Sequence, residues 1–386
     1  MPGLWDSHVH LSYPGPCSLQ RLIAGGVTSV RDLGGPPSEN LEWRQQIEAG
    51  TIVGPHLYLA GLDIESAGWM AAATKGFATL STASGAPAYP IWDWSPRFVM
   101  AGPSDAFQAV DIAVRSRMDV VKFRNLGADA FRALAAEARR RVIPLAGHAA
   151  NGISLADAAE AGQRSVEHSQ NLVLRLGTVS PREREVQYTR IARSGMFVTP
   201  TLVADTVWAP PEHVAALITD SKGHGEHYER HLSPHQMDVW ESMLIGGKPD
   251  RQAHDRALAE DIEQVRLAHL AGVSLLAGTD LGTLVTYPGV SLHEELELLT
   301  DRVGLAPREA LQAATTNAAR FFNLQSEAGG VAAGMRADLV LLRQNPLTDI
   351  RNTRLIDAVL TSGHYYDSKA LEAFGQCRSR IPSSKF

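Results

Sequence analysis

Two histidines near the start of the chain have the spacing of a metal-binding pair. His8 and His10 flank Val9 at the end of an apolar run, "GLWDSHVH". Side chains alternate along a strand, so both imidazoles are expected to point to the same side. Imidazole nitrogen is a good ligand for zinc and similar transition metals. His-x-His pairs also occur as ordinary strand residues, so this pair alone does not establish a metal site.

Four more residues with metal-binding chemistry end, or lie on, other strand-like runs. They are His148 in "LAGHAA", His168 in "VEHS", Asp280 in "AGTD" and Lys122 in "DVVKF". Each has an ordinary alternative, such as a hydrogen-bonded core histidine, a helix N-cap aspartate or a lysine that reaches the rim. Coincidence at matching positions on five strands is improbable, and the set predicts a metal centre.

Lys122 has chemistry of its own in such a centre. A lysine that is buried beside metal ions loses its charge easily, because desolvation and nearby positive charge both lower its pKa. The neutral amine can then add carbon dioxide. The product is a carbamate, an anionic ligand with two oxygens that can bridge two metals. We therefore predict that Lys122 is carboxylated.

The strands that position these residues alternate with helices rich in Ala, Leu, Arg and Glu, such as 129–141 and 154–162. This alternation predicts a parallel sheet and, over about 300 residues, an α/β fold of the (β/α)8 TIM-barrel type, whose active site lies at the carboxyl ends of the strands. An open doubly wound sheet is the alternative, but no GxGxxG or GxxxxGK[ST] motif supports a nucleotide-binding version. The eight expected strands are 3–10, 27–33, 55–64, 119–124, 142–150, 164–169, 196–203 and 273–281.

Other regions interrupt the alternation of strands and helices. The polar segment at about 205–265 is expected to be a helical insertion. From about 326 the sequence changes to short antiparallel strands with turns. The expected organisation is a barrel over 1–325, followed over 326–386 by the C-terminal strands of a small β-sandwich and a tail.

Candidates for substrate binding are fewer. Residues 66–104 are rich in Gly, Ala, Ser, Pro and Trp and are expected to form a long loop. Arg124 shares the face of Lys122 and can reach a substrate carboxylate or a loop. His293, after the last barrel strand, is a candidate support for the metal ligands, with helix capping as the alternative. The loop tryptophans, which line an apolar pocket or pack the loop onto the barrel, are Trp69, Trp92 and Trp94.

Composition excludes several classes of function. The 386 residues carry a net charge of −6, are 44% hydrophobic and 20% charged, and include no run of Lys and Arg, so nucleic acid is not an expected partner. No apolar run approaches the about 18 residues of a membrane span. Cys17 and Cys377 are too few for a disulfide framework. The expected partner is a small-molecule substrate, and a homo-oligomer is compatible with the sequence.

The sequence resembles the amidohydrolase superfamily, and within it the imidazolonepropionase-like and prolidase-like members with a carboxylated lysine. The resemblance implies that His8, His10 and Asp280 hold a more buried metal and that His148 and His168 hold a more exposed one. Carboxylated Lys122 would bridge the two divalent ions, which we expect to be zinc. The matching segments are "PGLWDSHVHL", "DVVKF", "GHAANGISLADAAEAGQRSVEHS", "AGVSLLAGTDLG", "HEELELL", "ALQAATTNAARFFNL" and "GMRADLVLL".

The activity implied by this resemblance is hydrolysis of an amide or related C–N bond, in an N-acyl amino acid, dipeptide or carbamate. A metal-bridging hydroxide would attack the carbonyl, and Asp280 would carry the proton to the leaving amine. Ester, lactone or organophosphate hydrolysis by the same centre is an alternative, and a truncated, non-catalytic barrel is another. A deaminase fits less well, since deaminases of this superfamily typically use one metal and no bridging lysine.

The sequence departs from its relatives at two places. Relatives usually carry a segment before the His-x-His strand that completes the β-sandwich, whereas here Met1 almost begins that strand. We therefore expect an incomplete sandwich, with a cytoplasmic location for the chain as given and the original location open. Some prolidase-like members have a Tyr shortly after the histidine of strand five. Here Ala150 and Asn151 lie there, which weakens a dipeptidase assignment.

Overall fold

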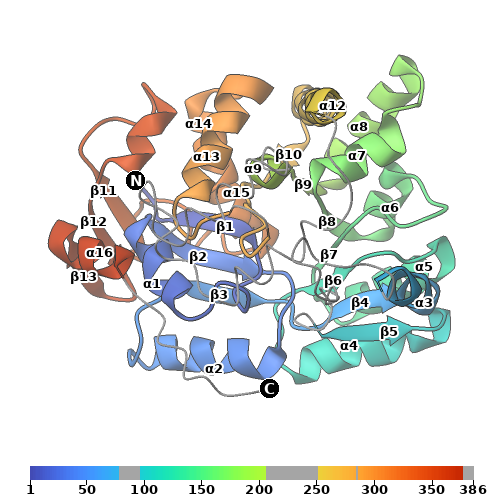
Figure 1. Cartoon of the computed structure of the whole chain (residues 1–386), viewed down its shortest axis with the longest axis horizontal. Coiled ribbons are helices and arrows are strands. Elements are labelled where there is room, and N and C mark those ends of the chain that lie inside the picture. The colour runs from blue at the N-terminus through green and yellow to red at the C-terminus, as the bar shows by residue number, and fades with distance from the viewer. Residues whose placement is uncertain (78–95, 206–250, 284–285, 377–386) are drawn as a thin grey trace.

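A computed structural model of the chain describes residues 1–77, 96–205, 251–283 and 286–376 (Figure 1). Within these ranges the strands belong to three sheets, with the orders β1-β2-β3, β10-β9-β8-β7-β6-β4-β5 and β11-β12-β13. Their bounds are β1 (Leu4–Val9), β2 (Val27–Asp32), β3 (His56–Leu59), β4 (Asp63–Ser66), β5 (Arg97–Met100), β6 (Val121–Phe123), β7 (Leu145–Gly147), β8 (Gln163–Glu167), β9 (Phe197–Thr199), β10 (Ser274–Leu275), β11 (Leu339–Leu342), β12 (Ile356–Thr361) and β13 (His364–Asp367).

The first two sheets are parallel throughout and together form the wall of an α/β TIM barrel. Backbone hydrogen bonds outside the regular ladders join their edges. The amide of Asp280, just after β10, donates to the carbonyl of His8 in β1 at 2.8 Å, and the amide of Asp119, just before β6, donates to the carbonyl of Leu59 in β3 at 2.8 Å. The predicted fold class is confirmed.

The helices cover the outside of this wall (Figure 1). In α5 the residues Phe131, Leu134, Ala135 and Ala138 are buried, which is the spacing of one helix face. Their bounds are α1 (Cys17–Ala24), α2 (Pro37–Glu48), α3 (Ala67–Phe77), α4 (Ala106–Arg115), α5 (Ala128–Arg140), α6 (Leu155–Ala161), α7 (Ser169–Leu176), α8 (Pro181–Ser194), α9 (Leu202–Asp205), α12 (Arg251–Leu270), α13 (Ser291–Leu298), α14 (Pro307–Ala313), α15 (Thr316–Phe321) and α16 (Ser368–Gly375).

Part of the expected loop over 66–104 is regular structure instead. Helix α3 opens that segment, and β5 near its end pairs in parallel with β4. The expected strand 55–64 is also divided, because the chain turns at Gly61, where φ is +71°. The pairing of β5 with β4 joins segments about 30 residues apart, which local composition does not reveal. Trp92, Trp94 and residues 206–250 of the expected insertion lie outside the described residues.

The C-terminal strands form an antiparallel sheet that contacts the start of the chain. The amide of Val340 donates to the carbonyl of Met1 at 2.9 Å, and the amide of Gly3 donates to the carbonyl of Asp338 at 2.7 Å. Figure 1 shows the N-terminus beside β11. Residues 1–3 therefore cover one edge of β11, in the sandwich that was expected to be incomplete. Among the described helices, none is both long enough and apolar enough to cross a membrane.

Candidate metal centre

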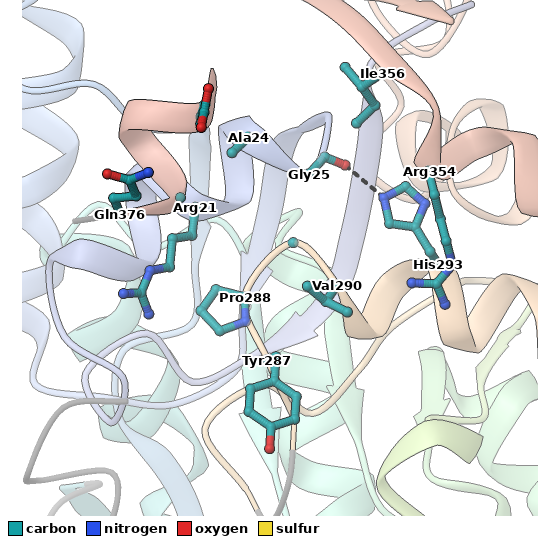
Figure 2. A pocket seen from close by; sticks show the side chains of 13 residues that line it. Arg21, Ala24, Gly25, Tyr287, Pro288, Val290, His293, Arg354, Ile356 and Gln376 are labelled. Atoms are coloured by element: carbon teal, nitrogen blue, oxygen red, sulfur yellow. Dashed lines mark hydrogen bonds between the residues drawn. The ribbon is translucent and has the colours of Figure 1, made fainter. Parts of the chain in front are cut away.

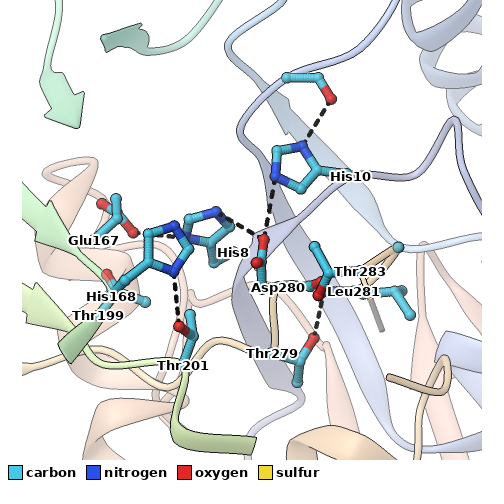
Figure 3. Close-up of polar contacts among 12 residues, drawn as sticks. His8, His10, Glu167, His168, Thr199, Thr201, Thr279, Asp280, Leu281 and Thr283 are labelled. Atoms are coloured by element: carbon cyan, nitrogen blue, oxygen red, sulfur yellow. Dashed lines mark hydrogen bonds and ion pairs between the residues drawn. The ribbon is translucent and has the colours of Figure 1, made fainter. Parts of the chain in front are cut away.

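Asp280 lies between the two histidines of the His-x-His strand (Figure 3). Its Oδ1 is 3.3 Å from Nε2 of His8 and 3.2 Å from Nε2 of His10. The potential ligand atoms of the three residues all lie within 4.8 Å of one another. They meet because β1 and the segment after β10 are neighbours, and parallel strands bring their carboxyl ends to one rim. These three side chains could hold a metal ion.

The other predicted ligands lie beside this group. The ring centroid of His168 is 4.6 Å from that of His8 and 5.0 Å from that of His148. Lys122 is only 1% exposed. Its Nζ and Nε2 of His148 are buried and have no hydrogen-bond partner within the described parts of the chain. Since buried polar atoms in proteins are almost always satisfied, two such nitrogens in one place indicate that a bound group completes the site.

Three of the histidines are held through their Nδ1 atoms. Nδ1 of His10 donates to the backbone carbonyl of Gly34 at 3.0 Å. Nδ1 of His168 lies 2.9 Å from Oγ1 of Thr201. Nδ1 of His8 lies 2.9 Å from a carboxylate oxygen, which is described below. A histidine that is held by one ring nitrogen presents the other as a metal ligand, which is the usual arrangement in metal sites.

Burial makes three of the histidines and the lysine of this group poor bases. Burial, followed by the charge of Lys122, lowers the pKa of His8 to about 4 and that of His148 well below 6.5. Burial likewise lowers the pKa of His168 well below its ordinary value. The pKa of Lys122 falls to about 8, chiefly through burial. These imidazoles are therefore neutral, which is the form that binds metals.

The carboxylate in the group is ionised. Burial raises the pKa of Asp280, but the contacts with His8 and His10 outweigh burial and bring the pKa well below its usual range. For His10, burial lowers the pKa, yet the contact with Asp280 raises it overall. A raised pKa means that His10 holds its second proton more firmly. A bound divalent cation would replace this proton as the positive partner of Asp280. The donor set, neutral imidazoles with an anionic oxygen, fits zinc or a similar ion.

A buried ion pair that sequence reasoning missed lies directly behind His8. Glu167, at the end of β8, receives the Nδ1 hydrogen bond of His8, and Nη2 of Arg31, in β2, lies 2.9 and 2.8 Å from its two oxygens. Both side chains are almost wholly buried. The available signal was a charged residue inside each of two apolar strands, because a buried charge requires a partner.

Backbone strain also gathers at this rim. His168, Thr201 and Asp280 have φ values of +64°, +51° and +55°. Non-glycine residues rarely adopt such angles, and each costs about 1–3 kcal/mol. At His168 this unusual backbone conformation changes the direction of the chain immediately after β8. Strained residues of this kind are concentrated at functional sites.

The predicted substrate-binding residues occupy different places. Nη1 of Arg124 lies 3.7 Å from Oδ2 of Asp63, which also forms an ion pair with Arg97. The side chain of Arg124 is 23% exposed. Trp69 is partly buried near the start of α3, where its backbone amide bonds Oγ of Ser66 at 3.2 Å. Arg124 directly follows β6, the strand that carries Lys122.

The structure does not bring His293 to the metal group. Its Nε2 donates to the carbonyl of Gly25 at 3.1 Å, and Nδ1 lies 2.9 Å from Oγ1 of Thr353. Gly25 precedes β2, so His293 lies at the amino ends of the strands, at the opposite end of the barrel from Asp280. There it lines a pocket of about 410 Å³ that also includes Arg354 (Figure 2).

Comparison with known proteins finds similar sequences and structures over most of the chain. The sequence is 26% identical to ochratoxinase from Aspergillus niger over 393 aligned residues, which cover 91% of this chain and 71% of that protein. The crystal structure of A. niger ochratoxinase matches 95% of this chain and 83% of its own with a TM-score of 0.66 and 21% identity.

Two other solved structures have similar scores. A bottromycin amidohydrolase matches with a TM-score of 0.69 and 25% identity, over 97% of this chain and 78% of its own. An Xaa-Pro dipeptidase with bound methionine matches with a TM-score of 0.65 and 21% identity, over 95% of this chain and 86% of its own. The sequence model of the amidohydrolase family matches residues 1–365. With nearly the whole chain matched, this protein belongs to the amidohydrolase family.

Proposed function

We propose that the protein hydrolyses an amide or related C–N bond in an N-acyl amino acid, a dipeptide or a carbamate, using two divalent metal ions. Membership of the amidohydrolase family and the likeness to an enzyme named as a dipeptidase support this reaction class. The observation that carries the proposal is the cluster itself. His8, His10 and Asp280 converge at one end of the barrel, beside two buried nitrogens that have no partner among the described residues.

In this proposal His8, His10 and Asp280 hold one ion, which we expect to be zinc, and His148 and His168 hold the other. When bound, the ions lower the pKa of water and polarise the carbonyl of the substrate. The carboxylate of Asp280, which is ionised at neutral pH, accepts the proton of the attacking water and transfers it to the leaving nitrogen. No nucleophilic serine or cysteine is needed.

Lys122 would serve as the bridge in its carboxylated form. The neutral amine attacks the carbon of carbon dioxide, one N–C bond forms, and one proton leaves to solvent, so the product carries a single negative charge. The buried position of Nζ and its lowered pKa favour the neutral amine that this reaction needs. The negative carbamate would also balance the charge of two cations in a buried site.

Arg124 is the group that would bind an anionic part of the substrate. It is partly exposed beside Lys122 and shares the carboxylate of Asp63 with Arg97. A guanidinium that shares its partner retains donors for a second carboxylate. We therefore place the free carboxylate of an N-acyl amino acid or dipeptide at Arg124.

The test is metal content, measured by elemental analysis of protein expressed with added zinc and bicarbonate. We expect about two zinc ions per chain in the unaltered protein and much less in Lys122→Ala. Lys75→Ala, which removes an exposed lysine of α3, is the matched control and should keep both ions. Full metal content in Lys122→Ala would rule out the bridging role of Lys122.

The substrate class is tested with the metal-loaded protein. N-acyl amino acids, dipeptides and carbamates are compared with esters, lactones and organophosphates of similar size. Preference for the C–N substrates supports the proposal, and preference for the others refutes it. Arg124→Met should raise KM for substrates with a free carboxylate and leave KM for their amidated counterparts unchanged.

A further inference from the structure

Glu167 is surrounded by hydrogen-bond donors. Its Oε1 is contacted by the hydroxyl of Ser165 and by Nη2 of Arg31 at 2.9 Å. Its Oε2 lies 2.8 Å from the same guanidinium nitrogen and 2.9 Å from Nδ1 of His8. The carboxylate is fully buried, so water does not supply these contacts. Each oxygen therefore has two protein partners.

Hydrogen bonds also hold the guanidinium of Arg31 in place. Its Nε donates to the carbonyl of Ser7 at 2.5 Å, Nη1 donates to Oγ of Ser165 at 2.9 Å, and Nη2 also reaches Oγ1 of Thr199 at 3.0 Å. These partners belong to β1, β8 and β9, while Arg31 itself is in β2. Because three other strands of the barrel hold this one side chain, it locks the rotamer of Glu167.

We propose that Glu167 and Arg31 are positioning residues that hold His8 in the tautomer protonated on Nδ1, so that Nε2 is the metal ligand. An ionised carboxylate can only accept a hydrogen bond, so Nδ1 of His8 must donate to it. The remaining nitrogen, Nε2, then carries the lone pair and faces Asp280 at 3.3 Å. The inference deepens the proposed function and rests on it for the metal.

His8 differs in this respect from two of its neighbours. His10 is held by a backbone carbonyl and His168 by a threonine hydroxyl, which are both neutral partners. A charged partner holds the ring more strongly and makes the opposite nitrogen a better donor. We therefore expect His8 to be the strongest metal ligand among these three histidines.

The geometry at the end of β8 explains how this support arises. Glu167 and His168 are consecutive, and successive side chains of a regular strand point to opposite faces. The unusual backbone at His168, with φ of +64° and ψ of 131°, breaks this alternation. Both side chains can then flank His8, since Glu167 takes Nδ1 and the ring of His168 lies 4.6 Å from the ring of His8.

The variant Glu167→Gln tests the proposal sharply. The oxygen of the glutamine is expected at the Oε1 position, because the hydroxyl of Ser165 donates only there, whereas Nη2 of Arg31 contacts both positions and favours neither. Its amide group then occupies the Oε2 position and donates to Nδ1 of His8. The proton of His8 is thereby forced onto Nε2, which blocks the metal ligand without a change in side-chain shape. Glu160→Gln is the matched control, because it makes the same substitution on α6, in an exposed ion pair with Arg190 and away from His8.

Two measurements decide the outcome. The first is the tautomer of His8 in metal-free protein, read from long-range ¹H–¹⁵N spectra of ¹⁵N-histidine-labelled protein and assigned with His8→Asn. We expect Nδ1–H in the unaltered protein and in Glu160→Gln, and Nε2–H in Glu167→Gln. An Nε2–H tautomer in the unaltered protein overturns the proposal, and this result does not depend on whether Glu167→Gln folds.

The second measurement is zinc affinity, determined by competition with a chromogenic chelator. We expect Glu167→Gln to weaken zinc binding by about 10–100-fold and Glu160→Gln to change it less than about threefold. Unchanged affinity in Glu167→Gln refutes the positioning role. The tautomer requires neither metal nor substrate, so a failure to hydrolyse amides would refute the proposed function separately.

Discussion

At the scale of single residues, Asp280 combines a charge, a strained backbone and a central position. Its carboxylate contacts His8 and His10, and its φ of +55° lies in the left-handed region. Few side chains tolerate that region, but Asp and Asn are among those that do. Asn can therefore replace Asp here without added strain, while the charge and the proton-accepting ability are lost.

We predict that Asp280→Asn lowers the rate of hydrolysis about 10²–10⁴-fold, because a general base contributes about that much to catalysis. The thermal unfolding temperature should remain close to that of the unaltered protein, since asparagine tolerates the left-handed backbone conformation at this position. Rates are measured with the best substrate of the screen described above, and unfolding is followed by circular dichroism. A variant that kept more than a tenth of the activity would contradict the role of Asp280 as proton carrier.

A second residue-scale prediction concerns the stability of the barrel in acid. Burial lowers the pKa of His293 from 6.5 to about 4, so the folded protein binds this proton less readily than the unfolded chain does. The stability of the native state is therefore complete above pH 6.5 and falls as the pH drops from about 6.5 towards about 4, by at most about 3 kcal/mol.

His293→Gln should reduce this acid sensitivity, because glutamine does not titrate and can still donate to the carbonyl of Gly25. The measurement is urea unfolding at a series of pH values between 4 and 8. His364→Gln, in the exposed strand β13, is the control and should leave the pH profile as it is. Equal acid sensitivity in His293→Gln and the unaltered protein would show that groups other than His293 cause the loss of stability in acid.

At the scale of elements, the metal group depends on how closely β1 approaches the segment after β10. Gly278 permits this approach. A Cβ placed there would lie 2.9 Å from both the backbone nitrogen and Cβ of His8, and 2.7 Å from Cγ2 of Thr199. Backbone atoms cannot move aside as a flexible side chain can, so any larger residue must push β1 and its histidines away.

We predict that Gly278→Ala destabilises the protein by about 1–3 kcal/mol and reduces zinc binding. The added methyl group displaces His8 relative to Asp280. Unfolding free energy and zinc content are the two readouts. Gly68→Ala in α3, where a Cβ meets no atom within 4 Å, is the matched control and should be neutral or slightly stabilising. Equal zinc content in both variants would show that this approach does not position His8.

At the scale of the whole molecule, the C-terminal sheet and the barrel share one apolar cluster. Val340 of β11 and Val359 of β12 are fully buried against Ile23 of α1 and Leu371 of α16. Residues 1–3, which lead directly into β1, also pair with β11. The strand that carries His8 and His10 is therefore anchored at its start by a sheet formed more than 330 residues later.

This arrangement predicts that Val340→Ala costs about 2 kcal/mol of stability, through lost burial and the cavity that remains. The barrel and the C-terminal sheet should still unfold in one transition, as followed by circular dichroism and tryptophan fluorescence. Leu341→Ala is the control, because the side chain of Leu341 is 40% exposed, whereas that of Val340 is fully buried. Two separate transitions would show that the sheet does not support the barrel.

Much of this protein is determined by patterns that are local in the sequence. Apolar runs that end in His, Lys or Asp specify strands with polar carboxyl ends, and all eight expected runs contain a strand of the barrel wall. Helix α6, over Leu155–Ala161, is capped by Ser154 and Gly162, which are the two ends of the expected helix 154–162. Such features depend on neighbours in the chain, so they can be predicted without a structure.

Contacts between distant segments were decided only by the tertiary structure. Arg31 and Glu167 are 136 residues apart, and nothing local indicates that they meet behind His8. The same holds for β5 beside β4 and for His293 at the far end of the barrel. Twist and closure of the sheet determine which side chains share the interior. The sequence by itself therefore determined which residues could bind a metal, and the closed barrel determined which partners hold them in place.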